Sequence, residues 1–289
     1  MPTKTNLMKV LIKRLLVIAC IFLTSINLMA DDFWIKQNFP DSVSILQIRI
    51  NQNDELFVGA IYHDSVPWGY GRILRSFNYA ATWEDITPFY YFPEIHDILI
   101  DPDGVLFLGT WYGGIFRSYD NGNSFEAVND GLSNTVPTLL ARQSDGTIYA
   151  GQFWGGGVDF SENDGGQWYP TNFPMAGING LGIDNNNAIY VGSNGLFYSD
   201  DNGLTWSEKN NGFSSIAMLN HKCFAFTENA EVFTGTADGI YFSENNGEEW
   251  VNCLNSQSVY YIQIFNDEIF AGTYEDGVYY SDDGGNSWS

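Results

Sequence analysis

Short segments in which apolar and polar residues alternate recur along the chain, and Gly, Asp, Asn or Pro bounds each of them. In one stretch, Asp97–Ile100 is followed by a turn at 101–104, then by Val105–Thr110, Gly114–Ser118 and a segment from Phe125. Such alternation, with β-branched and aromatic residues enriched, is typical of half-buried strands. The second of these segments returns five times: Glu55–Gly59, Thr147–Gly151, Ala188–Gly192, Glu231–Gly235 and Glu268–Gly272. No stretch after residue 30 has a helical period, so the sequence predicts an all-β protein.

An octapeptide of the form Ser-x-Asp-x-Gly-x-Thr-Trp follows each third segment. Its first residues are serines 76, 118, 161, 199, 243 and 281, separated by 42, 43, 38, 44 and 38 residues. The copy from Ser76 is the most divergent, because Ala80 stands where the other copies have Gly. Six copies at a period near 40 residues indicate a repeat protein with one supersecondary unit per repeat.

The residue types of the octapeptide suit a hairpin turn that satisfies its own polar groups. An Asp or Asn at the third position accepts hydrogen bonds from nearby backbone N–H groups, Gly adopts positive φ without steric cost, and the final aromatic ring is buried. We therefore assign a structural role to these positions: Ser118, Asp120, Gly122, Ser161, Asn163, Gly165, Trp168, Ser199, Asp201, Gly203, Trp206, Ser243, Asn245, Gly247, Trp250, Ser281, Asp283, Gly285 and Trp288.

These octapeptides resemble the Asp-box (BNR) repeats of sialidases, xyloglucan-cleaving hydrolases, sortilin-type receptors and photosystem II assembly-factor propellers. The resemblance covers nearly all of residues 31–289. Four antiparallel strands in each repeat of about 40 residues form a propeller blade. The expected fold is a β-propeller of six four-stranded blades, and the alternative is seven blades in a longer parent chain.

The first thirty residues have the pattern of a secretory signal peptide. Lys4, Lys9, Lys13 and Arg14 precede an apolar run that ends at Leu23, and cleavage is expected near Ala30. The predicted domains are thus a signal peptide at 1–30 and a single propeller at 31–289, whose C-terminus could be truncated. Phe33–Asn38 resembles the segment that follows an octapeptide, so it could form an outer strand of the last blade. The expected location is secreted, periplasmic or on the cell surface, with no membrane insertion after cleavage.

Charge excludes several classes of partner. The formal net charge is −23, and removal of residues 1–30 would make it −27. Nucleic acids and anionic membranes require a basic surface, so neither is expected as a partner. The repeat places Cys223 and Cys253 on the first and last strands of one blade, too far apart for a disulfide. The histidines lack metal-ligand spacing and the acidic loops lack the EF-hand pattern, so no metal, calcium or other cofactor is predicted.

Aromatic residues concentrate in the loops opposite the octapeptide turns. Propeller topology places the loops between second and third strands, and the connectors between blades, on one face. Flat rings and nearby acids there would suit a glycan or an extracellular protein, although the same rings could simply pack on one another. The candidate ligand-binding residues are Tyr62, Trp68, Tyr70, Tyr91, Asp97, Trp111, Tyr112, Phe153 and Trp154.

The leading functional hypothesis is an exported, non-catalytic propeller that binds a glycan or protein on this aromatic face. The alternative is a glycoside hydrolase of the Asp-box propeller type, complete or truncated. Its catalytic residues cannot be assigned, and the acids to test would be Glu94, Asp97, Glu275 and Asp276. The sialidase resemblance implies an arginine cluster, which the sparse arginines after residue 30 do not supply. A third reading is a structural module of a larger surface protein.

Overall fold

The computed structural model describes residues 43–62, 70–213, 223–229, 231–256 and 258–289. The described residues form β-strands, turns and loops, and none of them forms a helix long and apolar enough to cross a membrane. The predicted signal peptide and Trp68 lie outside these ranges. The chain divides into two compact units, one ending at Val128 and one beginning at Asn129, and we describe each by itself.

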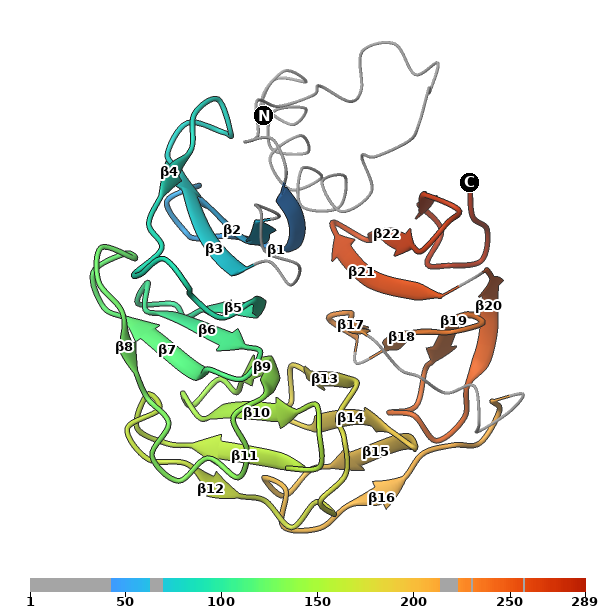
Figure 1. The fold of residues 1–289 in the computed structure, drawn as a ribbon. Coiled ribbons are helices and arrows are strands. Elements are labelled where there is room, and N and C mark those ends of the chain that lie inside the picture. Colours follow the sequence, from blue (N-terminus) through green and yellow to red (C-terminus); the bar gives the residue numbers. More distant parts are fainter. Residues whose placement is uncertain (1–42, 63–69, 214–222, 230, 257) are drawn as a thin grey trace. The chain divides into compact units, whose positions relative to one another are not determined.

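The first unit contains two antiparallel four-stranded sheets, whose strands pair in chain order (Figure 1). Blade one consists of β1 (Val43–Ile50), β2 (Leu56–Tyr62), β3 (Tyr70–Ser76) and β4 (Glu84–Asp85). Blade two consists of β5 (Ile95–Ile100), β6 (Leu106–Thr110), β7 (Gly114–Ser118) and β8 (Glu126–Ala127).

The second unit contains four antiparallel sheets, of which three have four strands and the last has three. Blade three comprises β9 (Pro137–Arg142), β10 (Ile148–Gln152), β11 (Val158–Ser161) and β12 (Tyr169–Pro170), and blade four comprises β13 (Gly180–Ile183), β14 (Ile189–Ser193), β15 (Gly195–Ser199) and β16 (Ser207–Glu208). Blade five comprises β17 (Cys223–Phe226), β18 (Val232–Thr236), β19 (Gly239–Ser243) and β20 (Val251–Asn255). Blade six comprises β21 (Val259–Phe265), β22 (Glu268–Thr273) and β23 (Val278–Ser281).

One residue pairs with the outer edge of blade six. Ser289 exchanges two backbone hydrogen bonds with Tyr280, at 2.9 and 3.0 Å. In blade three, Tyr169 pairs with Phe160 at the equivalent position. The residue after Trp288 therefore occupies the place where the outer strand begins in the four-stranded sheets.

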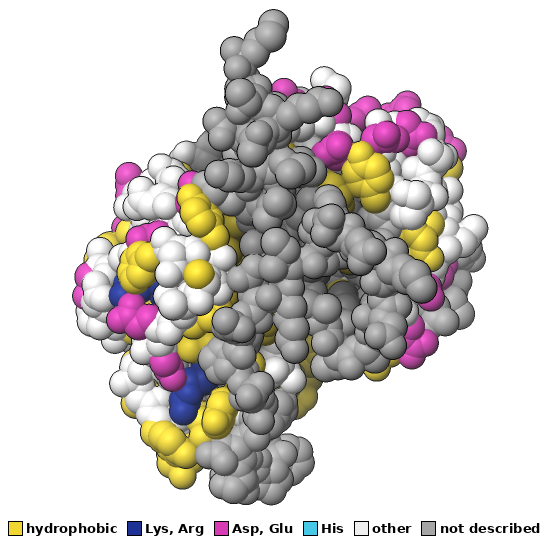
Figure 2. All heavy atoms as spheres, turned by 90° about the horizontal axis from the view of Figure 1, so that it is seen from above, with side chains coloured by type: hydrophobic (Ala, Val, Ile, Leu, Met, Phe, Trp, Pro, Cys, Tyr) yellow, Lys and Arg dark blue, Asp and Glu magenta, His cyan; other side chains and the backbone are white. Residues whose placement is uncertain are grey.

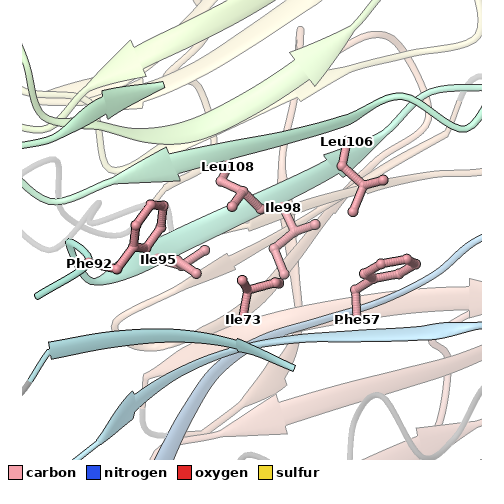
Figure 3. Close-up of a cluster of buried hydrophobic side chains, with 7 residues drawn as sticks. All are labelled: Phe57, Ile73, Phe92, Ile95, Ile98, Leu106 and Leu108. Atoms are coloured by element: carbon pink, nitrogen blue, oxygen red, sulfur yellow. The ribbon is translucent and has the colours of Figure 1, made fainter. Parts of the chain in front are cut away.

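Apolar side chains from both sheets of the first unit form its core. Ile73 of β3 and Phe57 of β2 pack with Ile95, Ile98, Phe92 and two leucines of β6, all at most 1% exposed (Figure 3). Strand alternation explains this packing, because successive residues of β3 point to opposite faces. Ile73 faces blade two, whereas Leu74 belongs to a separate cluster on the other face of blade one.

The octapeptide turns close through side-chain hydrogen bonds. In blade two, Ser118 Oγ donates to Asp120 Oδ1 at 2.8 Å and accepts from the Gly122 N–H at 2.8 Å. Asp120 accepts from the Ser124 N–H at 2.8 Å and from the Ser124 hydroxyl at 2.6 Å. The Gly takes a φ of +86°, in the left-handed region that favours glycine. Asp201 and Asp283 make the same set of bonds, whereas Asn163 and Asn245 keep the backbone bond to the residue four places on.

The divergent turn of blade one has the same geometry at a conformational cost. Ala80 N–H donates to Ser76 Oγ at 3.0 Å, but Ala80 has a φ of +66° and the preceding Tyr79 one of +57°. A side chain in this region costs about 1 kcal/mol relative to glycine. We expect Ala80→Gly to raise the free energy of unfolding by about 0.5–1 kcal/mol, measured by urea titration. A decrease would show that the buried methyl group contributes more than the backbone strain costs.

The carboxylates in these turns should make stability depend on acidity. Hydrogen bonds from Ser124 lower the pKa of Asp120 from 3.8 to about 2, and those from Ser287 do the same for Asp283. Bonds from Thr205 also lower the pKa of Asp201. Because these pKa values are depressed in the folded state, the stabilisation exists above pH 3.8 and disappears as the pH falls towards 2.

We therefore expect a variant with all three Asp residues replaced by Asn to lose stability at neutral pH but to show a flatter pH dependence between pH 5 and 2. Thermal melting across that range measures the effect. Asp103→Asn, in an exposed inner turn, is the control. A slope as steep as that of the unmodified chain would contradict the assignment.

The two cysteines lie on opposite edges of one sheet. Cys223 is in β17 and Cys253 is in β20, with β18 and β19 between them. Three strand spacings exceed the reach of a disulfide, so the two thiols cannot be joined in this fold.

Candidate binding site

The connector between blades one and two positions several aromatic side chains. The Gly71 N–H donates to Phe92 O at 2.8 Å, which attaches the connector to β3. Phe92 is 1% exposed, whereas Tyr90 and Tyr91 on the same connector are 56% and 70% exposed. A Cβ atom at position 71 would lie 1.9 Å from Pro93 O, so only glycine permits this close approach.

Four tyrosines form a contiguous group that we call the tyrosine cluster: Tyr62, Tyr70, Tyr90 and Tyr91. The Tyr70 ring centroid lies 5.8 Å from that of Tyr62, 4.9 Å from that of Tyr90 and 6.0 Å from that of Tyr91. Tyr90 and Tyr91 meet edge to face at 4.9 Å, and the hydroxyls of Tyr70 and Tyr90 are 3.0 Å apart. Tyr70 is only 4% exposed, so it supports the exposed rings and offers little surface itself.

Arg72 extends across the tyrosine cluster. Its guanidinium carbon lies 4.5 Å from the Tyr70 ring centroid and 5.5–5.6 Å from those of Tyr90 and Tyr62. Arg72 also donates to Tyr90 O at 3.1 Å and pairs with Asp85 at 3.3 Å. Cation–π contacts of this kind hold the rings in one orientation and keep the guanidinium charge over them.

A cavity of about 370 Å³ opens beside the cluster. Its lining includes Tyr62, Tyr90, Arg72, Asp85 and Trp83, all from blade one and the connector. It therefore combines flat apolar surfaces with one cation and one anion. Its volume is in the range of small-ligand sites.

A second aromatic group lies on blade two. The rings of His96 and Trp111 stack at 5.1 Å, and Tyr112 meets Trp111 edge to face at 5.6 Å. Tyr112 is 58% exposed and has a φ of +63°, which is rare for an aromatic residue. Glu94 lies 3.4 Å from His96 Nε2, and burial lowers the pKa of His96 while the Glu94 and Asp97 carboxylates oppose that shift. The stacked rings thus present a flat surface with a polar imidazole edge.

Asp97, one of the predicted ligand-binding residues, is buried in an ion pair. Its Oδ1 accepts from Arg49 Nη2 at 2.7 Å and from the Ile98 N–H at 2.9 Å, and the residue is 5% exposed. This pair connects β1 with β5, so we leave Asp97 out of the proposed ligand-contacting surface.

The other predicted residues fall in different places. Phe153 and Trp154 belong to the second unit, with ring centroids 6.0 Å apart and Trp154 52% exposed. Trp68 lies outside the described residues. Glu275 and Asp276 are exposed in the loop between β22 and β23. Within the described chain, no group of three or more His, Cys, Asp or Glu side chains could hold a metal ion.

A buried acid lies beneath the loop that carries Trp154. Asp159 and Gln152 are both 0% exposed, and Gln152 Nε2 donates to Asp159 Oδ2 at 2.8 Å. Asp159 also accepts from the Ser133 N–H at 3.0 Å and from its hydroxyl at 2.5 Å. The Gln152 Oε1 atom is buried without a hydrogen-bond partner. Desolvation raises the pKa of Asp159, although the three bonds oppose this.

Sequence reasoning did not single out Arg72 or Asp159, although the repeats contain a signal for both. The residue four places before the octapeptide serine is Gly in the other five repeats, and Arg72 replaces it in the first. The residue two places before that serine is Leu, Phe or Tyr elsewhere, and Asp159 replaces it in the third. A departure from the repeat marks both sites.

Comparisons with known proteins point to a fold and to no single activity. The chain is similar to a structure of YCF48 bound to D1 peptide, with 15% identity and a TM-score of 0.69 over 89% of this chain and 84% of that one. It is also similar to PorZ, a surface component of the type-IX secretion system of Porphyromonas gingivalis, with 14% identity and a TM-score of 0.68 over 89% of this chain and 42% of PorZ. An ancestral GH74 enzyme matches at 18% identity with a TM-score of 0.59 over 68% of this chain and 30% of the enzyme. No protein-family model and no curated protein matches the sequence.

The fold is a β-propeller. The expectation of an all-β propeller with six blades is confirmed by the six consecutive sheets and by these neighbours. At identities of 14–18%, the similarity extends to the fold alone. The neighbours include both a glycoside hydrolase and proteins whose names describe no catalysis, so the activity must be argued from this chain's own residues.

Proposed function

We propose that this protein is an exported, non-catalytic member of the Asp-box propellers that binds a glycan through the tyrosine cluster. One observation carries the proposal. Tyr90 and Tyr91 are 56% and 70% exposed, yet their connector is fixed from behind by the buried Phe92 and by the Gly71 hydrogen bond. Large exposed rings held in fixed orientations form a binding surface with little conformational entropy left to lose.

The chemistry of the adjoining cavity favours a sugar. Flat rings can stack on the apolar faces of a pyranose, while Arg72 and Asp85 can donate to and accept from its hydroxyls. Charged side chains and rings occur together in the 370 Å³ cavity, which has room for a small saccharide. Tyr112 and the His96–Trp111 stack, also in the first unit, offer a second set of rings for further sugar units.

Two further considerations support export and a binding role. The basic and apolar pattern of residues 1–30 is that of a signal peptide. Among the described residues of the first unit, each arginine forms an ion pair with a carboxylate, which leaves no free arginine group for a sialidase-like site. These arginines are Arg49, Arg72, Arg75 and Arg117.

A peptide is the second candidate ligand, because the YCF48 structure contains one.

The test is a glycan and polysaccharide array probed with residues 31–289. We expect saccharide binding that Tyr90→Ala/Tyr91→Ala weakens by about ten-fold, because stacking contributes about 0.5–1.5 kcal/mol per ring. Tyr119→Ala is the matched control, since Tyr119 is 60% exposed in the same unit but lies on the octapeptide turn of blade two.

Three outcomes would redirect the proposal. Equal binding by the Tyr90/Tyr91 and Tyr119 variants would place the sugar elsewhere. A blank array with folded protein would exclude a glycan among those displayed and leave the peptide. Released product from any bound saccharide, lost on replacing Glu94 by Gln, would turn the assignment to a hydrolase.

A further inference from the structure

Blade six presents a separate pair of exposed aromatic rings. Tyr260 lies in β21 and Tyr274 in the loop between β22 and β23, and they are 42% and 59% exposed. Their ring centroids are 6.0 Å apart and the ring planes are inclined by 37°. The two rings thus leave parts of their faces open to solvent.

Hydrogen bonds hold the loop under Tyr274 in place. The Tyr274 N–H donates to Ser258 O at 3.0 Å, so the loop is attached to the segment that leads into β21. Within the loop, the Asp276 N–H donates to Thr273 Oγ1 at 3.0 Å, and the Thr273 N–H donates to Gly277 O at 2.9 Å. Ser256 Oγ donates to Asp276 Oδ2 at 3.1 Å. The ring pair is therefore formed before any partner arrives.

The surroundings of the ring pair are strongly anionic. Glu275 and Asp276 follow Tyr274 directly and are both exposed. Residues 129–289 contain 21 Asp and Glu against 3 Lys and Arg, and Lys209 is already paired with Glu248. Acidic side chains are widespread on the face shown in Figure 2, whereas basic ones are confined to small areas.

We infer that Tyr260, Tyr274, Glu275 and Asp276 form a docking site for a basic segment of a protein partner, with an Arg or Lys side chain over the ring pair. The face of an aromatic ring carries negative electrostatic potential, so it attracts a cation. Two carboxylates beside the rings add to that attraction and extend it to neighbouring positive charges of the segment. A neutral sugar could also stack on the rings, but it would gain little from this surplus of charge.

The expected energy indicates a segment with several positive charges. An exposed cation–π contact contributes about 0.5–1 kcal/mol, too little for one isolated side chain to bind firmly. A basic segment would add the attraction of the acidic surface around the rings. The inference is independent of the proposed glycan site, because it concerns other residues, in the second unit.

Fluorescence anisotropy with a labelled poly-arginine peptide at physiological salt tests the inference on residues 31–289. We expect Tyr260→Ala/Tyr274→Ala to weaken binding by about five- to ten-fold, which corresponds to two cation–π contacts. Glu275→Gln/Asp276→Asn should weaken binding and also reduce its salt dependence. Tyr169→Ala, a 53% exposed tyrosine on β12 of the same unit, should leave the affinity unchanged.

The Tyr169→Ala control distinguishes binding at a specific site from general electrostatic attraction to an acidic protein. If the Tyr260/Tyr274 variant binds the peptide as tightly as the Tyr169 variant does, the peptide follows the overall charge and the inference is wrong. The single variant Tyr274→Ala serves if the double variant is unfolded, because Tyr274 is the more exposed ring. Loss of peptide binding with an intact glycan response, or the reverse, distinguishes this site from the tyrosine cluster.

Discussion

Gly71→Ala is expected to destabilise the chain by about 3 kcal/mol, because the new methyl group overlaps a backbone atom that has no room to retreat. The added Cβ would lie 1.9 Å from Pro93 O and 2.7 Å from the Pro93 carbonyl carbon. Relief requires the connector to move away from β3, which breaks the bond from the Gly71 N–H to Phe92 O and exposes Phe92. The midpoint of urea unfolding measures the loss.

The same substitution at Gly59 is a graded comparison. There the added Cβ would meet the Ile95 side chain at 3.0 and 3.2 Å and the Ile95 carbonyl oxygen at 3.3 Å, so small shifts suffice to relieve the contact. We expect the Gly59 variant to lose less stability than the Gly71 variant and to keep its ligand. The Gly71 variant should lose saccharide binding as well, since the connector that carries Tyr90 and Tyr91 is displaced. Equal stabilities for the two variants would contradict the close approach.

Asp159→Ala should cost a similar amount, about 3 kcal/mol, because it leaves the buried Gln152 amide without its acceptor, removes two bonds from Ser133 and leaves a cavity. The Ser133 N–H, the Ser133 hydroxyl and Gln152 Nε2 all donate to this carboxylate. Asp159→Asn should lose less stability than Asp159→Ala at neutral pH. Its amide can donate to Gln152 Oε1 once the Gln152 amide rotates, and this oxygen has no partner in the wild-type chain.

The raised pKa of Asp159 determines how the stability difference between Asp159→Asn and wild type changes with pH. Desolvation raises the pKa of Asp159 above its ordinary value of 3.8, so the folded state disfavours the ionised carboxylate. Its contribution to stability is therefore greatest below pH 3.8 and is lost as the pH rises through the folded-state pKa. We expect the stability of Asp159→Asn relative to wild type to increase as the pH rises through the folded-state pKa. Urea unfolding at several pH values measures this change. A difference that is constant with pH would show that Asp159 titrates normally.

The fold was predictable because the repeated information is local. Each octapeptide specifies a hairpin through bonds within eight residues, as between Ser199, Asp201 and Thr205. The alternation of segments such as Val105–Thr110 then identifies the strands that the hairpins join. Because the octapeptide occurs six times, the number of blades could be counted from the sequence without knowledge of any long-range contact.

The candidate site was less predictable because it depends on contacts that the repeat does not encode. The list of aromatic loop residues included Tyr91 but omitted Tyr90, whose ring lies against Tyr70 only because the connector folds back onto Gly71. Tyr70 and Asp97 were predicted to contact a ligand. Both are buried, and the residues next to them in the sequence give no sign of this. Burial of this kind follows from partners far along the chain, such as Arg49 for Asp97.

The choice of Asp or Asn in the octapeptide turns follows an order along the chain. The acid occupies the third position in blades two, four and six, as Asp120, Asp201 and Asp283, whereas blades one, three and five have Asn78, Asn163 and Asn245. The carboxylates are each matched with a Ser or Thr hydroxyl four residues on. No two consecutive repeats therefore place a carboxylate at this third position. In a protein with a net charge of −23, each Asn at this position contributes one negative charge fewer while the turn keeps its bond to the backbone. A designer who made all six turns identical with Asp would lose that spacing.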